Sequence, residues 1–227
     1  MGVFEDRRHA GRALAHAVRE RLDWEGALLL GLPRGGIPVA FEVACALQRP
    51  LDVFVVRKLG VPGQEELAMG AVASGGIVVI HADVVRAFSI VQPTIDAVVE
   101  RERHEIARRE ALYRDGRPPL QVEGRTLILI DDGLATGSTM RAAARALRPM
   151  AGRVCVAVPV AARATCEELS REVDQLVCLE TPEPFHAVGE FYREFDQTSD
   201  EEVRRLLAAA YHETGPPCVE QPDGRSK

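Results

Sequence analysis

Apolar runs with the character of buried strands alternate with amphipathic helical segments along the 227-residue chain. A continuous apolar run predicts a strand covered on both faces, and apolar residues three and four positions apart predict a helix. The predicted strands span residues 27–32, 51–56, 126–130, 154–158 and 175–179. The predicted helices span residues 7–22, 37–47, 93–113, 140–147, 165–173 and 200–211. This alternation indicates an α/β fold with a mostly parallel twisted sheet flanked by helices.

The remaining segments predict a loop and a hairpin. Residues 57–67 are polar and contain Gly and Pro, so we expect a loop there. Apolar runs at 70–73 and 77–80 flank a Ser-Gly-Gly turn and predict a hairpin. Asp6 and Asp200 are expected to cap the first and last helices. The longest helix has only a narrow apolar stripe, so its many Arg and Glu residues are expected to form a solvated face with ion pairs.

The length fits one large globular domain, or at most two small ones. A chain of this length with 46% hydrophobic residues has enough apolar surface for a single large core. We expect the domain to cover residues 1–211, with a helical excursion at about 82–114. Residues 212–227, rich in Pro, Gly and charge, are expected to be a disordered tail.

The charge balance and the termini exclude several classes of protein. A net charge of −6 argues against a protein built to coat nucleic acid. No apolar run approaches the roughly 20 residues that span a bilayer, and the charged N-terminus lacks the apolar core of a signal peptide. Five widely spaced cysteines without a Cys-x-x-Cys pair predict reduced thiols, among them core thiols at Cys155 and Cys178. We therefore expect a cytoplasmic protein with no membrane or nucleic-acid partner.

The residues with the clearest chemistry follow the predicted strand at 126–130. Ligands of parallel sheets bind beyond the carboxyl ends of the strands. Three hydroxyls and a glycine at 136–139 open the next helix and predict a phosphate pocket. Asp131 and Asp132 suit a divalent cation or ligand hydroxyls, so the run as a whole predicts a sugar phosphate site. An Asp-rich turn at a strand end is the alternative, but it leaves the hydroxyl-glycine cluster unexplained.

This run resembles the binding motif for phosphoribosyl pyrophosphate (PRPP) in type I phosphoribosyltransferases. The motif has four apolar residues, two acids and a Thr-Gly-x-Thr ending, and the wider resemblance covers roughly residues 25–180. It implies that Asp131 and Asp132 hold the ribose hydroxyls and, largely through PRPP, a Mg²⁺ ion. It also implies that the 5′-phosphate is wrapped by Ala135, Thr136, Gly137, Ser138 and Thr139.

Two further loops match parts of the same family. The turn with Arg34, Gly35 and Gly36 resembles the pyrophosphate loop, although alone it also fits a strand-to-helix turn with a surface charge. Arg57 and Lys58 precede a stretch that resembles the flexible loop closing over the reactants, and the resemblance implies catalytic roles for both. An ordinary pair of solvated charges is an equally weighted alternative for these two residues. Glu65 or its neighbour Glu66 is a candidate base, although an exposed loop pair is favoured for these two acids.

A third segment resembles the family's hood, the cover over the acceptor. Residues 185–192, together with the 31–36 and 57–60 patterns, are similar to a bacterial branch of uncharacterised phosphoribosyltransferase-domain proteins. The resemblance implies a small C-terminal hood at about 181–198, with His186 and Tyr192 contacting the acceptor. Core packing of the phenylalanines in this segment is an equal alternative.

The resemblance implies transfer of the phosphoribosyl group of PRPP, with Mg²⁺, to a small nitrogenous acceptor with release of pyrophosphate. Enzymes of this family that act on 6-oxopurines commonly carry an acid where Ala135 stands, which disfavours hypoxanthine or guanine. Adenine-like, orotate-like and non-nucleobase acceptors remain open, as does a homodimer. A PRPP-binding regulator without turnover is the second hypothesis. Lys58, the only lysine apart from the C-terminal Lys227, is expected to serve the reaction because an ammonium differs from a guanidinium in hydration and reach.

Overall fold

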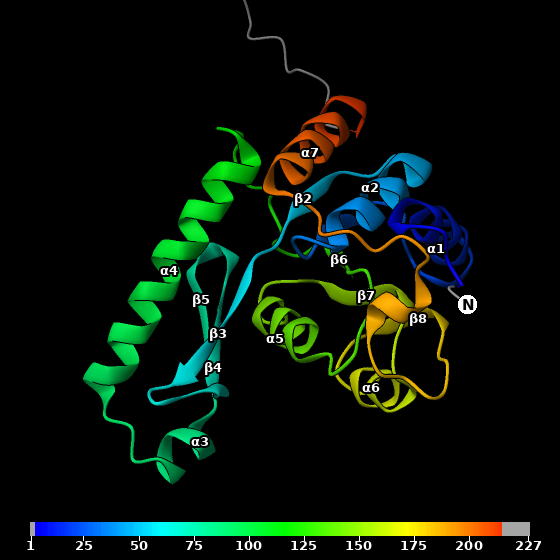
Figure 1. Ribbon diagram of the computed structural model, residues 1–227. Helices are drawn as coiled ribbons and strands as arrows, with labels where there is room; N and C mark the ends of the chain where they lie inside the picture. Colours follow the sequence, from blue (N-terminus) through cyan, green and yellow to red (C-terminus); the bar gives the residue numbers. More distant parts are fainter. Residues whose placement is uncertain (1–2, 215–227) are drawn as a thin grey trace, which may run out of the picture.

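The computed structural model describes residues 3–214, without the side chains of Glu66, His212, Glu213 and Thr214. Its centre is a parallel five-stranded sheet in the order β2-β1-β6-β7-β8 (Figure 1). The strands are β1 (Leu28–Gly31), β2 (Leu51–Val53), β6 (Thr126–Ile130), β7 (Arg153–Val160) and β8 (Gln175–Glu180). The predicted parallel α/β fold is therefore confirmed.

Alternate strand residues feed two separate cores, one on each face of the sheet. Leu29 and Ile128 point into the core with α1 (Arg7–Arg21), α2 (Gly36–Leu47) and α7 (Asp200–Thr214). Leu30 and Leu129 point into the core on the other face, with α5 (Ser138–Leu147) and α6 (Arg163–Leu169). Burial on both faces explains why these strands are continuous apolar runs.

A second, antiparallel sheet stands beside the central one (Figure 1). It contains β3 (Val56–Val61), β4 (Gln64–Ala73) and β5 (Ile77–Ile80), with a short 3₁₀ turn, η1 (Ser74–Gly76), between the last two. The helices α3 (Ala82–Ala87) and α4 (Gln92–Arg114) complete this protruding lobe. The predicted hairpin at 70–73 and 77–80 is confirmed.

The predicted loop at 57–67 is wrong, because this stretch forms β3 and the start of β4. Leu59 and Val61 are buried on the side of the strand that faces the apolar stripe of α4, including Ile95 and Ile106. The alternation of these residues with Lys58 and Gly60 is the strand pattern of a half-covered sheet. The predicted strand at 51–56 is correspondingly split, with β2 ending at Val53.

One of the two predicted helix caps is present, and several helix ends lie at other residues than predicted. The carboxylate of Asp6 accepts from the His9 backbone N–H (2.6 Å) and caps α1 as expected. Asp200 is instead the first residue of α7, and the Ser199 hydroxyl caps that helix by accepting from the Glu202 N–H (3.1 Å). α6 ends at Leu169, four residues before the predicted position 173. α7 continues to Thr214, and the rest of the predicted tail lies outside the described residues.

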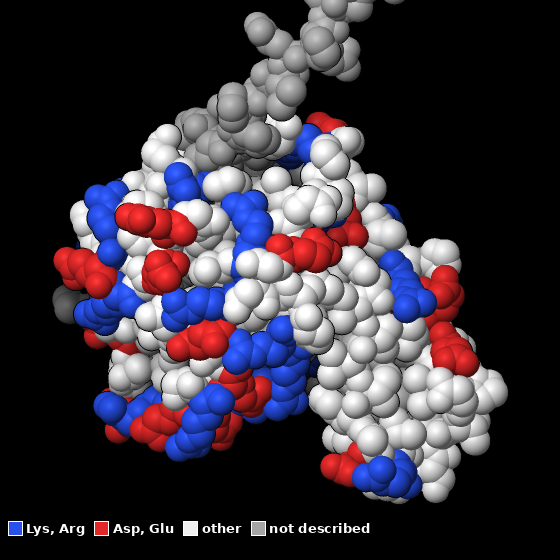
Figure 2. Space-filling view, turned by 180° about the vertical axis from the view of Figure 1, so that it is seen from behind, with Lys and Arg blue, Asp and Glu red and all other residues white. Residues whose placement is uncertain are grey.

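Charged side chains are unevenly distributed over the surface. The main body mixes both signs, whereas the protruding lobe shows few charges on the face seen from behind (Figure 2). On α4, Glu105 pairs with Arg108 (2.8 Å) and Arg109 (2.7 Å), which lowers the pKa of Glu105 to about 2. These pairs are the ion-paired solvated face expected for the longest helix. None of the helices in the described part of the chain is long and apolar enough to cross a membrane.

Among the described cysteines, Cys155, Cys166 and Cys178 are free thiols. Burial in the core raises the pKa of Cys155 to about 11, whereas Cys178, also expected in the core, is only half-buried. Cys45 and Cys166 are half-buried too, and Cys218 lies outside the described residues.

Candidate active site

The predicted phosphate loop lies between β6 and α5. Gly137, with φ of +64°, turns the chain into α5, and the Thr136 hydroxyl donates to the Ser138 hydroxyl oxygen (3.2 Å). The backbone N–H groups of Gly137, Thr139 and Met140 donate no hydrogen bond within residues 3–214. A cavity of about 220 Å³ is lined by Asp131, residues 133–140 and Val188. Free N–H groups at a helix N-terminus, opening into a cavity, are suited to an anion.

Thr165 supports this loop from α6, and no pattern in the sequence pointed to it. Its buried hydroxyl donates to the Ala135 carbonyl oxygen (2.6 Å). Its methyl group lies so close to Gly137 that a Cβ there would approach within 2.6 Å. The side chain of Ala135 itself is exposed and adds no polar group to the site. Thr165 thus positions the loop that was predicted to wrap the phosphate.

Thr165→Val is expected to lower the affinity for PRPP about fivefold, because one hydrogen bond of about 1 kcal/mol that shapes the loop is lost while the side-chain volume is kept. Calorimetric titration with PRPP and Mg²⁺ measures the change. Ser170→Ala is the matched control, since it removes an exposed hydroxyl just after the same helix that donates to the Glu167 carbonyl oxygen. Equal affinities for Thr165→Val and the wild type would remove Thr165 from the site.

The predicted pyrophosphate turn lies against the acid pair. The peptide between Pro33 and Arg34 is cis, and α2 begins at Gly36. A Cβ on Gly35 would lie 2.0 Å from Asp132 Oδ2, and one on Gly36 would lie 2.7 Å from the Ile130 carbonyl oxygen. The close approach of the two loops therefore requires glycine at both positions.

The turn offers free hydrogen-bond donors. Within the described residues, the backbone N–H groups of Arg34 and Gly35 donate no hydrogen bond. The Arg34 guanidinium is 36% exposed and lies 3.8 Å from the Asp200 carboxylate. Asp200 also accepts from the Tyr113 hydroxyl (2.8 Å), and burial together with Asp200 raises the pKa of Tyr113 to about 12. Arg34 remains half-exposed at the edge of the site.

The acid pair is held in a poorly solvated position. Burial, and then the charge of Asp132, raises the pKa of Asp131 well above its usual value. Burial also raises the pKa of Asp132, and this rise is opposed by Arg7. The Arg7 Nε donates to Asp132 Oδ2 (2.8 Å), and the two side chains are only 12% and 14% exposed. Sequence reasoning missed Arg7, which lies 125 residues away at the start of α1.

The hood segment also contacts Asp132. The Tyr192 hydroxyl donates to the Asp132 carbonyl oxygen (2.5 Å), and burial raises the pKa of Tyr192 strongly. Tyr192 is buried and its bond is to the backbone of Asp132, whereas His186 is exposed with no side-chain hydrogen bond within the described residues. The phenylalanines pack among themselves, with the Phe185 and Phe191 ring centres 5.0 Å apart. The structure thus brings Tyr192, but not His186, to the acid pair.

The hairpin residues lie on two different faces. Arg57 points to α4, where its Nε lies 2.8 Å from Glu102 Oε2. Lys58 lines a cavity of about 150 Å³ with Ser138 and Arg141 of α5. Lys and Arg side chains gather beside the hollow between the lobe and the main body (Figure 2). Glu65 lies at the β3–β4 turn, where it accepts from the Gly63 N–H (3.2 Å).

Comparisons with known proteins agree with this architecture. The phosphoribosyl transferase domain family matches residues 5–195. A Mycobacterium tuberculosis protein that is named as a predicted phosphoribosyl transferase is 45% identical to this chain over 214 residues. The match covers 94% of this chain and 48% of that protein. The chain therefore spans about half the length of the curated relatives it matches.

Solved structures extend the comparison to the fold. The protein TT1426 of Thermus thermophilus is 41% identical, with a TM-score of 0.82 over 92% of this chain and 99% of that one. A hypothetical protein of Neisseria gonorrhoeae, solved with bound ppGpp, shares the fold at 15% identity, with a TM-score of 0.50 over 92% of this chain and 97% of that one. The acid pair and the two glycine turns lie beyond adjacent strands of the sheet. Because the family model also matches most of the chain, the chain belongs to the phosphoribosyl transferase domain family.

Proposed function

We propose that the chain binds PRPP with Mg²⁺ and transfers its phosphoribosyl group to a small nitrogen nucleophile, releasing pyrophosphate. One observation carries the proposal: the N-termini of α2 and α5 follow strands β1 and β6, which are neighbours in the sheet. The acid pair contacts the turn before α2 and precedes the phosphate loop before α5. Free N–H groups at both turns favour the two phosphate-bearing ends of PRPP. The carboxylates favour its ribose hydroxyls.

Each group in this arrangement has a role in the displacement. The nitrogen forms a bond to C1 of the ribose, while the bond from C1 to the pyrophosphate oxygen breaks and its electron pair leaves with pyrophosphate. The nitrogen then loses one proton to solvent. Arg34 and the free N–H groups of the first turn are suited to stabilise the negative charge that grows on the leaving group. Asp131 and Asp132 orient the ribose, and the hood limits access of water.

The donor set fits a Mg²⁺ ion held largely by the substrate. Within the described residues, no group of three or more His, Cys, Asp or Glu side chains could hold a metal ion. Mg²⁺ usually binds through one or two carboxylates together with substrate phosphates and water. Asp131 makes no ion pair in the described chain, and its raised pKa reflects burial beside a like charge that a cation relieves. When bound, the ion would neutralise charge on the pyrophosphate oxygens.

The direct test is release of pyrophosphate from PRPP with Mg²⁺ and a panel of acceptors: adenine, orotate, hypoxanthine and ammonia. We expect release with at least one acceptor other than hypoxanthine, and its loss when EDTA removes the metal. Hypoxanthine is disfavoured because Ala135 leaves the phosphate loop without a carboxylate that could accept a proton from a 6-oxopurine. Tight PRPP binding without release for every acceptor would favour the PRPP-binding regulator instead.

Lys58→Gln is expected to lower the affinity for PRPP about tenfold, because it removes a positive charge that lines a cavity together with Ser138 of the phosphate loop. Lys58→Arg should retain part of the affinity, since the charge stays but the compact ammonium is lost. Calorimetric titration with PRPP and Mg²⁺ again gives the comparison.

Arg57→Gln provides the contrast on the same strand. We expect it to lose less affinity than Lys58→Gln, because the Arg57 side chain is paired with Glu102 on the opposite face. Arg103→Gln, on the exposed side of α4, controls for a general loss of positive charge on the lobe. A larger loss for Arg57→Gln than for Lys58→Gln would reverse the assignment of the two residues.

A further inference from the structure

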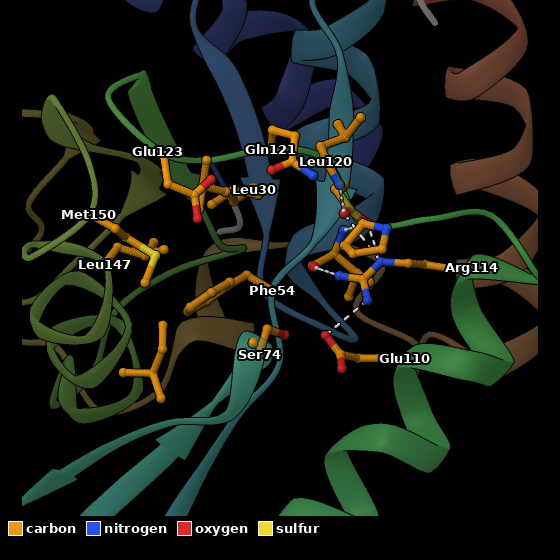
Figure 3. Close-up of a pocket in the computed structure, with 16 residues that line it drawn as sticks. Leu30, Phe54, Ser74, Glu110, Arg114, Leu120, Gln121, Glu123, Leu147 and Met150 are labelled. Atoms are coloured by element: carbon orange, nitrogen blue, oxygen red, sulfur yellow. Dashed lines mark hydrogen bonds and ion pairs between the residues drawn. The ribbon is translucent and has the colours of Figure 1, made fainter.

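A third cavity, of about 280 Å³, lies where the protruding lobe meets the central sheet (Figure 3). Its walls come from strands β1 and β2, from η1, from the C-terminal ends of α4 and α5, and from residues 119–123 before β6. Leu30, Phe54, Leu147 and Met150 form much of the apolar lining. The cavity shares no lining residue with the 220 Å³ cavity beside the acid pair. It is therefore a separate concave site close to the lower size limit of ligand pockets.

Each nitrogen of the one guanidinium in the lining donates a hydrogen bond within the protein. Arg114 Nε donates to Asp52 (2.9 Å), Nη1 donates to Glu110 Oε1 (2.9 Å), and Nη2 donates to the Val53 carbonyl oxygen (3.2 Å). Asp52 also accepts from the Val53 and Leu120 N–H groups. The Arg114 and Asp52 side chains are only 11% and 10% exposed. This buried pair therefore forms part of the wall, and Asp52 and Glu110 balance the guanidinium charge.

Two carboxylates in the lining have oxygens without a partner in the described part of the chain, and so has the amide of Gln121. The Glu123 side chain makes no hydrogen bond or ion pair within the described residues, and Glu110 Oε2 is likewise without a partner there. The Ser74 hydroxyl oxygen accepts from the Val55 N–H (2.8 Å), so its proton remains to be donated. The cavity carries three carboxylates against one guanidinium. Glu123 and Glu110 lie on opposite sides of the apolar interior (Figure 3).

We propose that this cavity binds a small organic cation, an amine, amidine or guanidine carried on an apolar, preferably aromatic, body. The excess of carboxylates selects the positive charge, and the apolar walls select the body. Met150 adds a flexible, polarisable side chain that adapts to an aromatic ring. Ser74 holds Val55, one of the two residues between β2 and β3, so a ligand here would contact both the sheet and the lobe. The proposal does not depend on phosphoribosyl transfer.

Benzamidine, a planar aromatic cation, tests the proposal when compared with benzamide and benzoate, which share its shape but not its charge. Calorimetric titration of the full chain should show benzamidine binding at least tenfold tighter than benzamide, with no binding of benzoate. Glu123→Gln should weaken benzamidine binding several-fold, because a free carboxylate beside the cavity is lost. Glu110→Gln should weaken it further, and Glu123→Gln keeps the test decisive if Glu110→Gln disturbs the Arg114 pair.

Two control variants locate the binding. Glu20→Gln removes an exposed carboxylate on α1 that has no side-chain partner within the described residues, and it should leave the affinity for benzamidine unchanged. Asp131→Asn should also leave it unchanged, which separates this cavity from the acid pair. Two ligand results would overturn the proposal: benzamidine does not bind, or benzamide binds as tightly as benzamidine. Two variant results would also overturn it: Glu123→Gln binds benzamidine as tightly as the wild type, or Asp131→Asn no longer binds it.

Discussion

Replacing Asp131 with asparagine is expected to lower the affinity for PRPP with Mg²⁺ roughly 100-fold, because one or more hydrogen bonds to a charged carboxylate are lost. The same change should not lower the stability of the fold. The Asp131 carboxylate accepts one hydrogen bond, from the Asp132 N–H (2.9 Å), and an asparagine oxygen can accept it equally well. Asp131 makes no ion pair within the described residues, and removing its charge relieves repulsion of Asp132.

A variant that loses PRPP affinity but keeps the stability of the fold identifies a ligand-binding residue, whereas a structural residue would lose stability. Calorimetric titration with PRPP and Mg²⁺ measures the first quantity, and urea unfolding without ligand measures the second. Asp83→Asn, on the exposed surface of α3, is the control for loss of one carboxylate. Unchanged PRPP affinity in Asp131→Asn would show that the acid pair does not hold the donor.

The parallel sheet could be predicted because its central strands, β1, β6 and β7, are covered on both faces. Residues 126–130 and 154–158 are almost entirely apolar, so no knowledge of their partners is needed to recognise a buried strand. The site motif was equally accessible, since Asp131 and the 136–139 cluster lie within one short run directly after such a strand. Features that depend on one continuous segment are thus visible without the fold.

The structure of the protruding lobe depends on contacts between segments that lie far apart in the sequence. Residues 56–61 bury only one face, and that face is covered by α4, which comes more than 30 residues later in the chain. Without that partner, Arg57 and Lys58 look like a polar pair at the start of a loop. In the strand they are neighbours in sequence but point to opposite faces. Only the pairing register decides which of them approaches the phosphate loop.

The supports of the acid pair were also beyond sequence reasoning. Arg7 and Asp132 are far apart in sequence, and the α1 helix that carries Arg7 has an ordinary amphipathic pattern. The N-terminal segment and the hood are joined by backbone hydrogen bonds, from the Phe4 N–H to the Phe191 carbonyl oxygen (2.9 Å) and from the Arg193 N–H to the Phe4 carbonyl oxygen (2.9 Å). Arg7 and Tyr192 then both reach Asp132. The N-terminal segment therefore belongs to the same unit as the hood.

Arg7→Met is expected to lower the free energy of unfolding by about 3–5 kcal/mol, because it leaves the Asp132 carboxylate poorly exposed and without its counter-ion. The Arg7 guanidinium also lies 3.8 Å from the centre of the Phe195 ring and donates to the Asp196 carbonyl oxygen (2.7 Å). The substitution therefore removes contacts with both the acid pair and the hood. Urea unfolding monitored by circular dichroism measures the loss.

A double-mutant cycle separates the ion pair from the other contacts of Arg7. In Arg7→Met combined with Asp132→Asn no unpaired charge is left at Asp132, so the double variant should be more stable than Arg7→Met alone. Arg193→Met is the matched control: its ion pair with Glu5 joins the same two segments, but both side chains are largely exposed, so the expected cost is below about 1 kcal/mol. If Arg7→Met cost no more than Arg193→Met, the pair with Asp132 would contribute nothing beyond a surface contact. If the double variant were less stable than Arg7→Met, the cost would come from the hood contacts, and Arg7 would anchor the hood rather than neutralise the acid pair.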